Sequence, residues 1–272
     1  MRTILKWGLV SAIGVIGLFS GWALAQEEAE HADTAPEVKA EDKAAATEEK
    51  ENWLPLGVSG NVAVYTDYSF RGISQTGRNM ALQGGFDFNH SSGLFAGYWA
   101  SSTNFGNTYM ENDFYGGYAG AIGDLSYKAS ATFFYYPGDE QFNYWEFGGF
   151  AGYDFKILSL STGCIGSPDY FGTLGTGFYI PGGFAVPLPT ISCPIPNGKD
   201  CIQPSFDANA GYTNTSTQIF SGTHHYWDWN AGLVLTLPFH FKLDFRYVGT
   251  DVRDVAGRDA GDRFIFGAKY LF

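Results

Sequence analysis

Residues 227–247 have the sequence WDWNAGLVLTLPFHFKLDFRY. Every second residue from Trp227 to Leu237 is apolar, and the positions between them include Asp228 and Asn230. The alternation resumes after Pro238. Successive side chains of a β-strand point to opposite faces, so a period of two gives each strand one apolar and one polar face. The stretch therefore predicts two antiparallel strands joined by a tight turn at Pro238.

The same period runs along residues 53–272 and predicts twelve strands. We expect them at residues 61–71, 80–90, 93–101, 112–120, 125–136, 144–154, 156–165, 177–187, 206–212, 225–237, 239–250 and 263–272. In the first, Tyr68 and Phe70 are expected on the apolar face. The chain also has 24 Phe, 17 Tyr, 7 Trp and 36 Gly. This pattern is typical of an all-β fold, a transmembrane antiparallel up-and-down β-barrel, although a soluble β-sandwich can share the composition.

The connections between the predicted strands alternate in length. Outer-membrane barrels have short periplasmic turns and longer external loops. The connections after even-numbered strands are short, whereas 102–111, 137–143, 213–224 and 251–262 are longer. The exception is 188–205, which contains Cys193 and Cys201 and is predicted to be a periplasmic insertion. The periplasm is oxidising, so we expect these two cysteines to form a disulfide and Cys164 to be left over.

The N-terminal residues 1–25 are predicted to be a signal peptide. Arg2 and Lys6 precede an apolar segment, and Ala23-Leu24-Ala25 is a small-x-small cleavage site. An uncleaved membrane anchor is the alternative. Export through a cleaved signal peptide, together with the predicted barrel, leads us to expect the chain in the outer membrane of a Gram-negative bacterium.

Residues 26–52 differ from the rest, with ten acids, three lysines and seven alanines. Such a segment buries too little apolar surface to fold alone, so we expect a disordered periplasmic tail. Contact between this tail and the cell wall is an open alternative.

The last predicted strand ends at the C-terminus. Phe264, Phe266, Tyr270 and Phe272 share one face, and the final residue is aromatic. This arrangement resembles the terminal signal that the outer-membrane assembly machinery recognises; the alternative is a chance aromatic end.

Residues 60–77, GNVAVYTDYSFRGISQTG, resemble the Gcw_chp family of proteobacteria, whose members are also called TorF-family porins. The resemblance continues in residues 81–87, 97–101, 113–118 and 143–146. It implies an outer-membrane barrel of porin architecture and supplies no catalytic residues.

The chain has a net charge of -12, which argues against a nucleic-acid partner because phosphate binding needs a basic face. Charged residues at inward positions of the predicted strands are expected to line the lumen: Asp67, Arg71, Asp87, Asp113, Lys128, Glu146, Asp228, Lys242, Asp244, Arg246, Arg263 and Lys269. If acids and bases pair across the bore, the barrel is plugged. If they segregate, a field forms that passes small solutes.

Few residues indicate catalysis or metal binding. His224 and His225 are adjacent, so on a strand they would point apart. Asp251, Asp254, Asp259 and Asp262 lie in one external loop without the spacing of an EF-hand. We expect no enzyme activity and no cofactor.

The sequence favours a narrow passive channel for small hydrophilic solutes, embedded among outer-membrane lipids and lipopolysaccharide. A non-conducting structural or ligand-binding barrel is the first alternative. An outer-membrane enzyme acting on lipid is the second.

Overall fold

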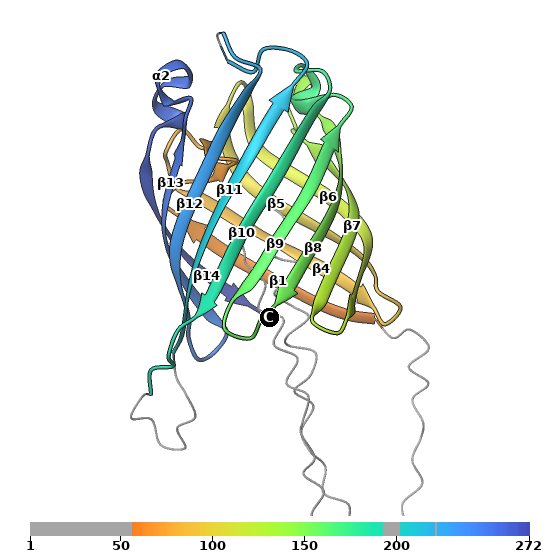
Figure 1. The fold of residues 1–272 in the computed structure, drawn as a ribbon. Coiled ribbons are helices and arrows are strands. Elements are labelled where there is room, and N and C mark those ends of the chain that lie inside the picture. The colour runs from red at the N-terminus through yellow and green to blue at the C-terminus, as the bar shows by residue number, and fades with distance from the viewer. Residues whose placement is uncertain (1–55, 193–201, 221) are drawn as a thin grey trace, which may run out of the picture.

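The computed structural model describes residues 56–192, 202–220 and 222–272. Twelve long strands form one closed barrel (Figure 1). Their bounds are β1 (Leu56–Tyr65), β4 (Ala81–His90), β5 (Leu94–Phe105), β6 (Thr108–Ile122), β7 (Leu125–Tyr135), β8 (Tyr144–Asp154), β9 (Ser159–Ser167), β10 (Gly177–Pro187), β11 (Gln203–Thr215), β12 (His225–Thr236), β13 (Phe241–Thr250) and β14 (Arg263–Leu271).

Each strand of the barrel pairs antiparallel with its neighbours in the sequence, which confirms the up-and-down topology. β1 also pairs with β14, with Asn61 opposite Leu271, and this pairing closes the ring. The C-terminal residue takes part, because Gly60 and Phe272 exchange backbone hydrogen bonds of 2.8 and 2.9 Å. A closed sheet has no edge strand to expose to lipid or to another chain.

The two faces of the wall differ as the alternation predicts. Large apolar side chains such as Val62, Leu82 and Phe264 are exposed on the outside. Polar side chains such as Asn61 and Asp87 are buried on the inside. An apolar exterior around a polar interior is the arrangement of transmembrane β-barrels.

All twelve predicted strands are present, but several boundaries were wrong. The predicted loop 102–111 is mostly strand, because β5 and β6 extend until a tight turn at Gly106, which has φ +54°. The strand predicted to start at residue 239 begins at Phe241, because Phe239 and His240 adopt positive φ in the turn after β12.

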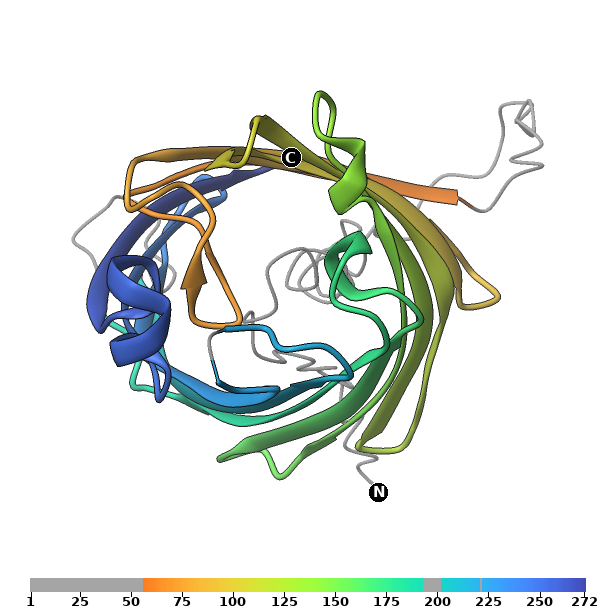
Figure 2. The same ribbon diagram turned by 90° about the horizontal axis from the view of Figure 1, so that it is seen from above.

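The main correction concerns residues 66–80. The strand predicted at 61–71 ends at Tyr65, and the chain then folds into the barrel as a short hairpin of β2 (Ser69–Phe70) and β3 (Ile73–Ser74). Seen from above, this hairpin lies within the ring of strands (Figure 2). Tyr68 and Phe70, expected on the apolar outer face, are 2% and 7% exposed. We call residues 66–80 the inner hairpin.

The connection between β10 and β11 extends beyond the end of the barrel wall. Ile191 and Ile202 exchange backbone hydrogen bonds of 2.9 and 3.2 Å, which prolongs the pairing of these strands. The predicted disulfide between Cys193 and Cys201 lies outside the described residues. Cys164 is free and exposed on β9.

Short helices occur only in the connections of the described ranges: η2 (Glu140–Phe142), η3 (Tyr170–Gly172), α2 (Arg253–Ala256) and η4 (Gly257–Ala260). None of the helices in the described part of the chain has the length and apolar character needed to cross a membrane.

Candidate functional site

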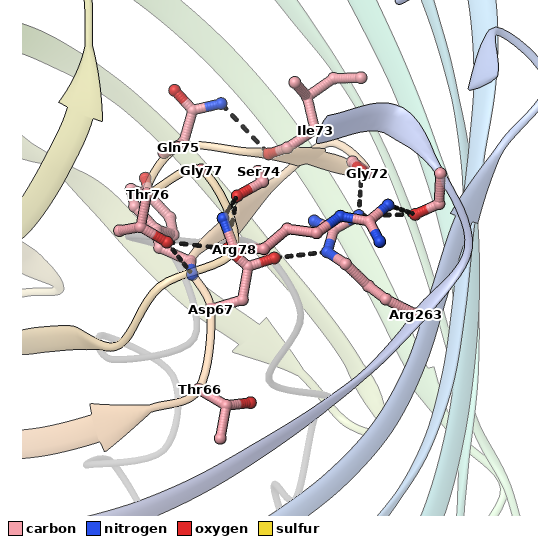
Figure 3. Close-up of polar contacts among 12 residues, drawn as sticks. Thr66, Asp67, Gly72, Ile73, Ser74, Gln75, Thr76, Gly77, Arg78 and Arg263 are labelled. Atoms are coloured by element: carbon pink, nitrogen blue, oxygen red, sulfur yellow. Dashed lines mark hydrogen bonds and ion pairs between the residues drawn. The ribbon is translucent and has the colours of Figure 1, made fainter. Parts of the chain in front are cut away.

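The base of the inner hairpin is held by one carboxylate. Asp67 accepts hydrogen bonds from the hydroxyls of Ser74 at 2.5 Å and Thr76 at 2.8 Å (Figure 3). Its other oxygen forms an ion pair with Arg263 of β14. A carboxylate on the first arm of a hairpin that accepts two hydrogen bonds from the returning arm fixes the shape of the turn, and the ion pair with Arg263 also holds the turn against the wall.

Two arginines add contacts between the inner hairpin and residues 251–262, the connection between β13 and β14. Arg263 donates to the carbonyl of Gly72 at 2.9 Å and to that of Gly261 at 3.1 Å. Arg78 donates to the same Gly261 carbonyl at 2.8 Å. The inner hairpin is therefore fastened to β14 and to the residues that precede it.

The tip of the inner hairpin reaches the far wall. Arg71 donates to both carboxylate oxygens of Glu146 on β8, at 2.7 and 2.8 Å. Both side chains are 6% exposed. In the ring of strands β8 lies almost opposite β1, from which the hairpin departs, so this ion pair spans the bore.

Aromatic rings surround the Arg71 guanidinium. Its central carbon lies 4.2 Å from the ring centroid of Tyr179, 4.8 Å from Phe70 and 5.2 Å from Tyr170. A cation held over ring faces in a water-poor site gains electrostatic energy from each ring. The rings and Glu146 together compensate for burying the arginine charge.

Gly72 allows the tip of the inner hairpin to pack against the barrel wall. Its φ is +81°, a conformation that residues with a side chain rarely adopt. A Cβ at this position would lie 2.3 Å from Cγ2 of Thr250 and 3.0 Å from Cβ of Asp228. The tip is thus packed against β12 and β13 and has no room for a larger residue.

An aromatic cluster fills the bore around the hairpin. Tyr68 packs edge-on against Trp99 at 5.4 Å between ring centroids, and Phe70 packs against Phe134 at 6.0 Å. The buried cluster is formed by Tyr68, Phe70, Ala81, Trp99, Phe134, Tyr136, Tyr144 and Tyr170. Because these residues come from the hairpin and from several strands, the part of the bore around the inner hairpin is occupied by packed side chains.

One buried carboxylate lies within this cluster. Glu111 accepts hydrogen bonds from the hydroxyl of Tyr68 at 2.6 Å and from that of Tyr136 at 2.7 Å. Glu111 is 1% exposed, so these two hydroxyls replace water as its partners. Sequence reasoning missed Glu111 because it assigned the residue to an external loop.

A second ion-pair network lies toward the other end of the barrel. Arg246 donates to Asp207 at 2.7 Å, to Asn230 at 2.9 Å and to Asp244 at 3.2 Å. Asp207 was missed by the sequence analysis, although its alternation with Phe206 places it on the polar face of the predicted strand. Lys128 lies 4.7 Å from the ring centroid of Phe95.

The predicted lumen residues are thus inside the barrel in two different ways. Ten of them lie on strands of the wall. Two of these ten are partly buried on β13, namely Lys242 and Asp244. The other eight are buried: Asp87, Asp113, Lys128, Glu146, Asp228, Arg246, Arg263 and Lys269. Asp67 and Arg71 are inside because the hairpin carries them there, and the strand predicted for them was wrong. That these twelve residues line a channel stays a prediction.

Polar groups near mid-strand lack protein partners. Both amide atoms of Asn61 and of Asn209, and the hydroxyl of Ser130, are buried and have no hydrogen-bond partner among the described residues. They come from β1, β11 and β7, on different sides of the ring. Buried polar atoms without a protein partner are normally hydrogen-bonded to water. These atoms are almost inaccessible to solvent, so they are unsatisfied polar positions on the inner face of the wall.

The other candidates for chemistry are not assembled into a site. Within the described ranges, no group of three or more His, Cys, Asp and Glu side chains has an arrangement that could hold a metal ion. In the acidic external loop, Asp262 pairs with Arg253 at 2.9 Å and Asp251 accepts from the backbone N–H of Trp227 at 2.8 Å. Part of that loop is helical, as α2 and η4.

Comparison with known proteins gives a family and a fold. The family model described as "Bacterial protein of unknown function (Gcw_chp)" matches residues 49–270. No curated protein matches the chain. Among solved structures, the NanC porin is similar, with a TM-score of 0.51 and 10% identity, over 79% of this chain and 98% of that one. The KdgM porin is similar, with a TM-score of 0.51 and 8% identity, over 79% and 99%. At these identities the likeness concerns the fold alone.

Proposed function

The chain belongs to the Gcw_chp family, and from the interior of its barrel we propose that it is an outer-membrane passive channel for small hydrophilic solutes. The inner hairpin sets the width of the passage. The observation that carries the proposal is a closed wall of twelve strands with an apolar exterior and with polar side chains such as Asn61, Asp207 and Asn209 on its inner face. The likeness of fold to the NanC and KdgM porins supports it.

The hairpin is the element that restricts passage in this proposal. It contacts β8 through Arg71, β12 and β13 through Gly72, and β14 through Asp67. A segment that is attached on several sides of a bore narrows it, and one attached by ion pairs and hydrogen bonds can be released without unfolding the wall. We therefore expect small currents from the wild-type protein.

The export route and the surroundings belong to the same proposal. Residues 1–25 would be removed on export, and residues 26–52 would remain as a periplasmic tail that can contact the cell wall. The face formed by Phe264, Phe266, Tyr270 and Phe272 would be read by the assembly machinery, and the apolar exterior would meet lipid and lipopolysaccharide.

A non-conducting barrel is the second candidate, and one observation favours it. The pairs Arg71–Glu146, Arg246–Asp207 and Arg263–Asp67 join acids to bases inside the barrel, which is the arrangement expected of a plugged lumen. The two candidates differ in whether release of the hairpin opens a path.

Gly72→Ala tests the proposal without changing any charge. The added Cβ would collide with Thr250 and Asp228 and would disfavour the positive φ. The tip of the inner hairpin should therefore move away from β12 and β13. Refolded residues 26–272 should conduct weakly in planar bilayers, and Gly72→Ala should conduct several-fold more. The matched control is Gly149→Ala, since a Cβ on Gly149 would have nothing within 4 Å. It should behave as wild type.

Folding of each variant is checked by the mobility of heated and unheated samples in SDS gels, because closed barrels resist SDS until they are heated. If correctly folded wild-type and Gly72→Ala proteins both insert and pass no current, the channel proposal is wrong and the structural barrel replaces it.

A further inference from the structure

We propose that the wall around Arg71 is a binding site for a guanidinium group, and that Arg71 is the chain's own occupant of this site. The hairpin supplies the guanidinium, and the wall supplies Glu146, Tyr170 and Tyr179, which we call the guanidinium site. A planar guanidinium binds a carboxylate through several N–H groups and stacks on aromatic faces, and the site offers both. The contacts are two hydrogen bonds from Nη2 of Arg71 to Glu146 and distances from the guanidinium carbon to the ring centroids of 4.2 Å for Tyr179 and 5.2 Å for Tyr170.

The site would persist without its present occupant. Glu146 belongs to β8 and Tyr179 to β10, and both strands are part of the closed wall. Tyr170 lies in η3, which directly connects β9 to β10. Of the groups around the guanidinium, Phe70 alone in this set would leave with the hairpin.

Asp228 places a second carboxylate near the guanidinium, so the site carries more negative charge than Arg71 alone neutralises. Asp228 is 4% exposed, and its Oδ1 accepts a hydrogen bond from the Tyr179 hydroxyl at 3.2 Å. Its Oδ2 is buried and has no hydrogen-bond partner among the described residues. Asp228 also interacts electrostatically with Arg71. Two carboxylates and two tyrosines thus face one guanidinium, and one carboxylate oxygen can accept a further N–H donor.

The chemistry of these groups selects the ligand class. An anion would face Glu146 and Asp228 at close range in a buried site, where like charges repel strongly. A primary ammonium could pair with Glu146, but it lacks the planar set of N–H donors and the flat face that suits Tyr179. The favoured ligand is therefore a small solute that carries a guanidinium group.

A guanidinium solute would have to compete with Arg71 for the guanidinium site. A group tethered by a short segment has an effective concentration on the order of millimolar or more. An external guanidinium must reach that concentration, or make further contacts such as one with Asp228, to displace Arg71. Displacement would free the tip of the inner hairpin. This last step rests on the proposed channel function, in which the freed hairpin widens the passage.

Binding is tested in a variant whose site has lost its own occupant. Arg71→Ala in the refolded full-length mature chain should be stabilised by ethylguanidinium chloride, with the heat-unfolding midpoint rising by about 3 °C or more as the site saturates. Ethylammonium chloride at equal concentration controls for ionic strength. The double variant Arg71→Ala with Glu146→Gln should show no such rise. Arg71→Ser serves the same purpose should the alanine variant not refold.

If ethylguanidinium raises the unfolding midpoint of Arg71→Ala no more than it raises that of the double variant, at all concentrations, the guanidinium site is overturned. A conductance measurement separates this from failure of the channel proposal. Arg71→Ala should conduct several-fold more than wild type, and ethylguanidinium should change that current whereas ethylammonium should not. Stabilisation by ethylguanidinium in a protein that passes no current would keep the site and refute the channel.

Discussion

Asp67 and Arg263 lie 196 positions apart in the sequence and form an ion pair whose side chains are 4% and 7% exposed. The pair joins the first external connection of the barrel to its last strand. β14 pairs with β1 to close the barrel, so the inner hairpin is fixed by contacts between the two ends of the barrel sequence.

Asp67→Asn should strongly destabilise the protein. It would leave the buried guanidinium of Arg263 without its anionic partner and weaken the bonds that Ser74 and Thr76 donate. Breaking a buried ion pair from one side costs about 3–5 kcal/mol. The free energy of unfolding, measured by urea titration in lipid vesicles, should fall by an amount of that order.

The control for this prediction is the exposed pair of Lys156 and Asp124 at the opposite end of the barrel, 2.7 Å apart and 62% and 46% exposed. The hydrogen bond to Asp124 raises the pKa of Lys156, so this amine keeps its charge at neutral pH. Lys156→Met should leave the stability nearly unchanged, because solvent screens this pair. Equal effects of Asp67→Asn and Lys156→Met would contradict the importance of the buried pair.

The double variant Tyr68→Phe with Tyr136→Phe should also be destabilised. It removes the two hydroxyls that donate to the buried carboxylate of Glu111. A hydrogen bond to a charged group contributes about 1.5–3 kcal/mol, and leaving that group unsatisfied costs a comparable amount. Tyr127→Phe is the control, because Tyr127 is 38% exposed on the outer face. If the double variant unfolds at the same urea concentration as this control, the Glu111 network does not stabilise the fold.

The barrel could be predicted from the sequence because the period of two is a local signal. Each strand needs one apolar and one polar face, and this requirement produces a visible alternation of apolar and polar residues in runs such as Trp227–Leu237. Strand ends were harder to place. Gly106 ends β5 in a two-residue turn, but nothing in the alternation around residues 102–111 distinguishes a long hairpin from a loop.

The inner hairpin could not be predicted in the same way. Residues 66–71 continue the alternation of β1, so Tyr68 and Phe70 were assigned to the apolar exterior. The same alternation suits a segment whose aromatic side chains pack inside the bore. What decides between them is the set of contacts with Trp99, Phe134 and Arg263, which are remote in sequence. The glycine at position 72, directly after the alternating run, is a local sign of the turn.

The state of the three cysteines is testable by mass spectrometry without reduction. Cys164 is free and exposed on the outer face of β9, so it should be modified by a membrane-permeant maleimide in a folded, lipid-embedded protein. We predict that Cys193 and Cys201 are bridged and resist the reagent until reduced. The bridge should contribute about 2–3 kcal/mol by restricting a short loop of the unfolded chain.

Cys164→Ser is the control for this experiment. It should abolish labelling of the unreduced protein while the mass remains that of a single disulfide. A peptide that joins Cys164 to either of the other cysteines would refute the assignment.

The last prediction concerns ion selectivity at the external mouth. In the segment after β13, Asp251, Asp254, Asp259 and Asp262 outnumber Arg253 and Arg258. The Asp254 side chain is 93% exposed, whereas Asp262 is engaged by Arg253 at 2.9 Å. A negative vestibule raises the local concentration of cations, but salt at 0.1 M screens exposed charge within about 10 Å. We therefore expect small ohmic currents with a weak cation preference that fades as salt rises.

The double variant Asp254→Asn with Asp259→Asn separates this vestibule charge from the structural contacts of Asp251 and Asp262. The reversal potential under a potassium chloride gradient should move toward zero at low salt, while conductance at about 1 M salt should stay nearly unchanged because the Debye length there is about 3 Å. Arg258→Gln is the opposing control and should increase the cation preference, since it removes a positive charge from the same segment. A reversal potential that is the same in wild type and both variants at low salt would show that the external aspartates do not influence ion passage. Selectivity would then have to arise deeper in the bore, where Glu111 and Asp228 are buried against the inner hairpin.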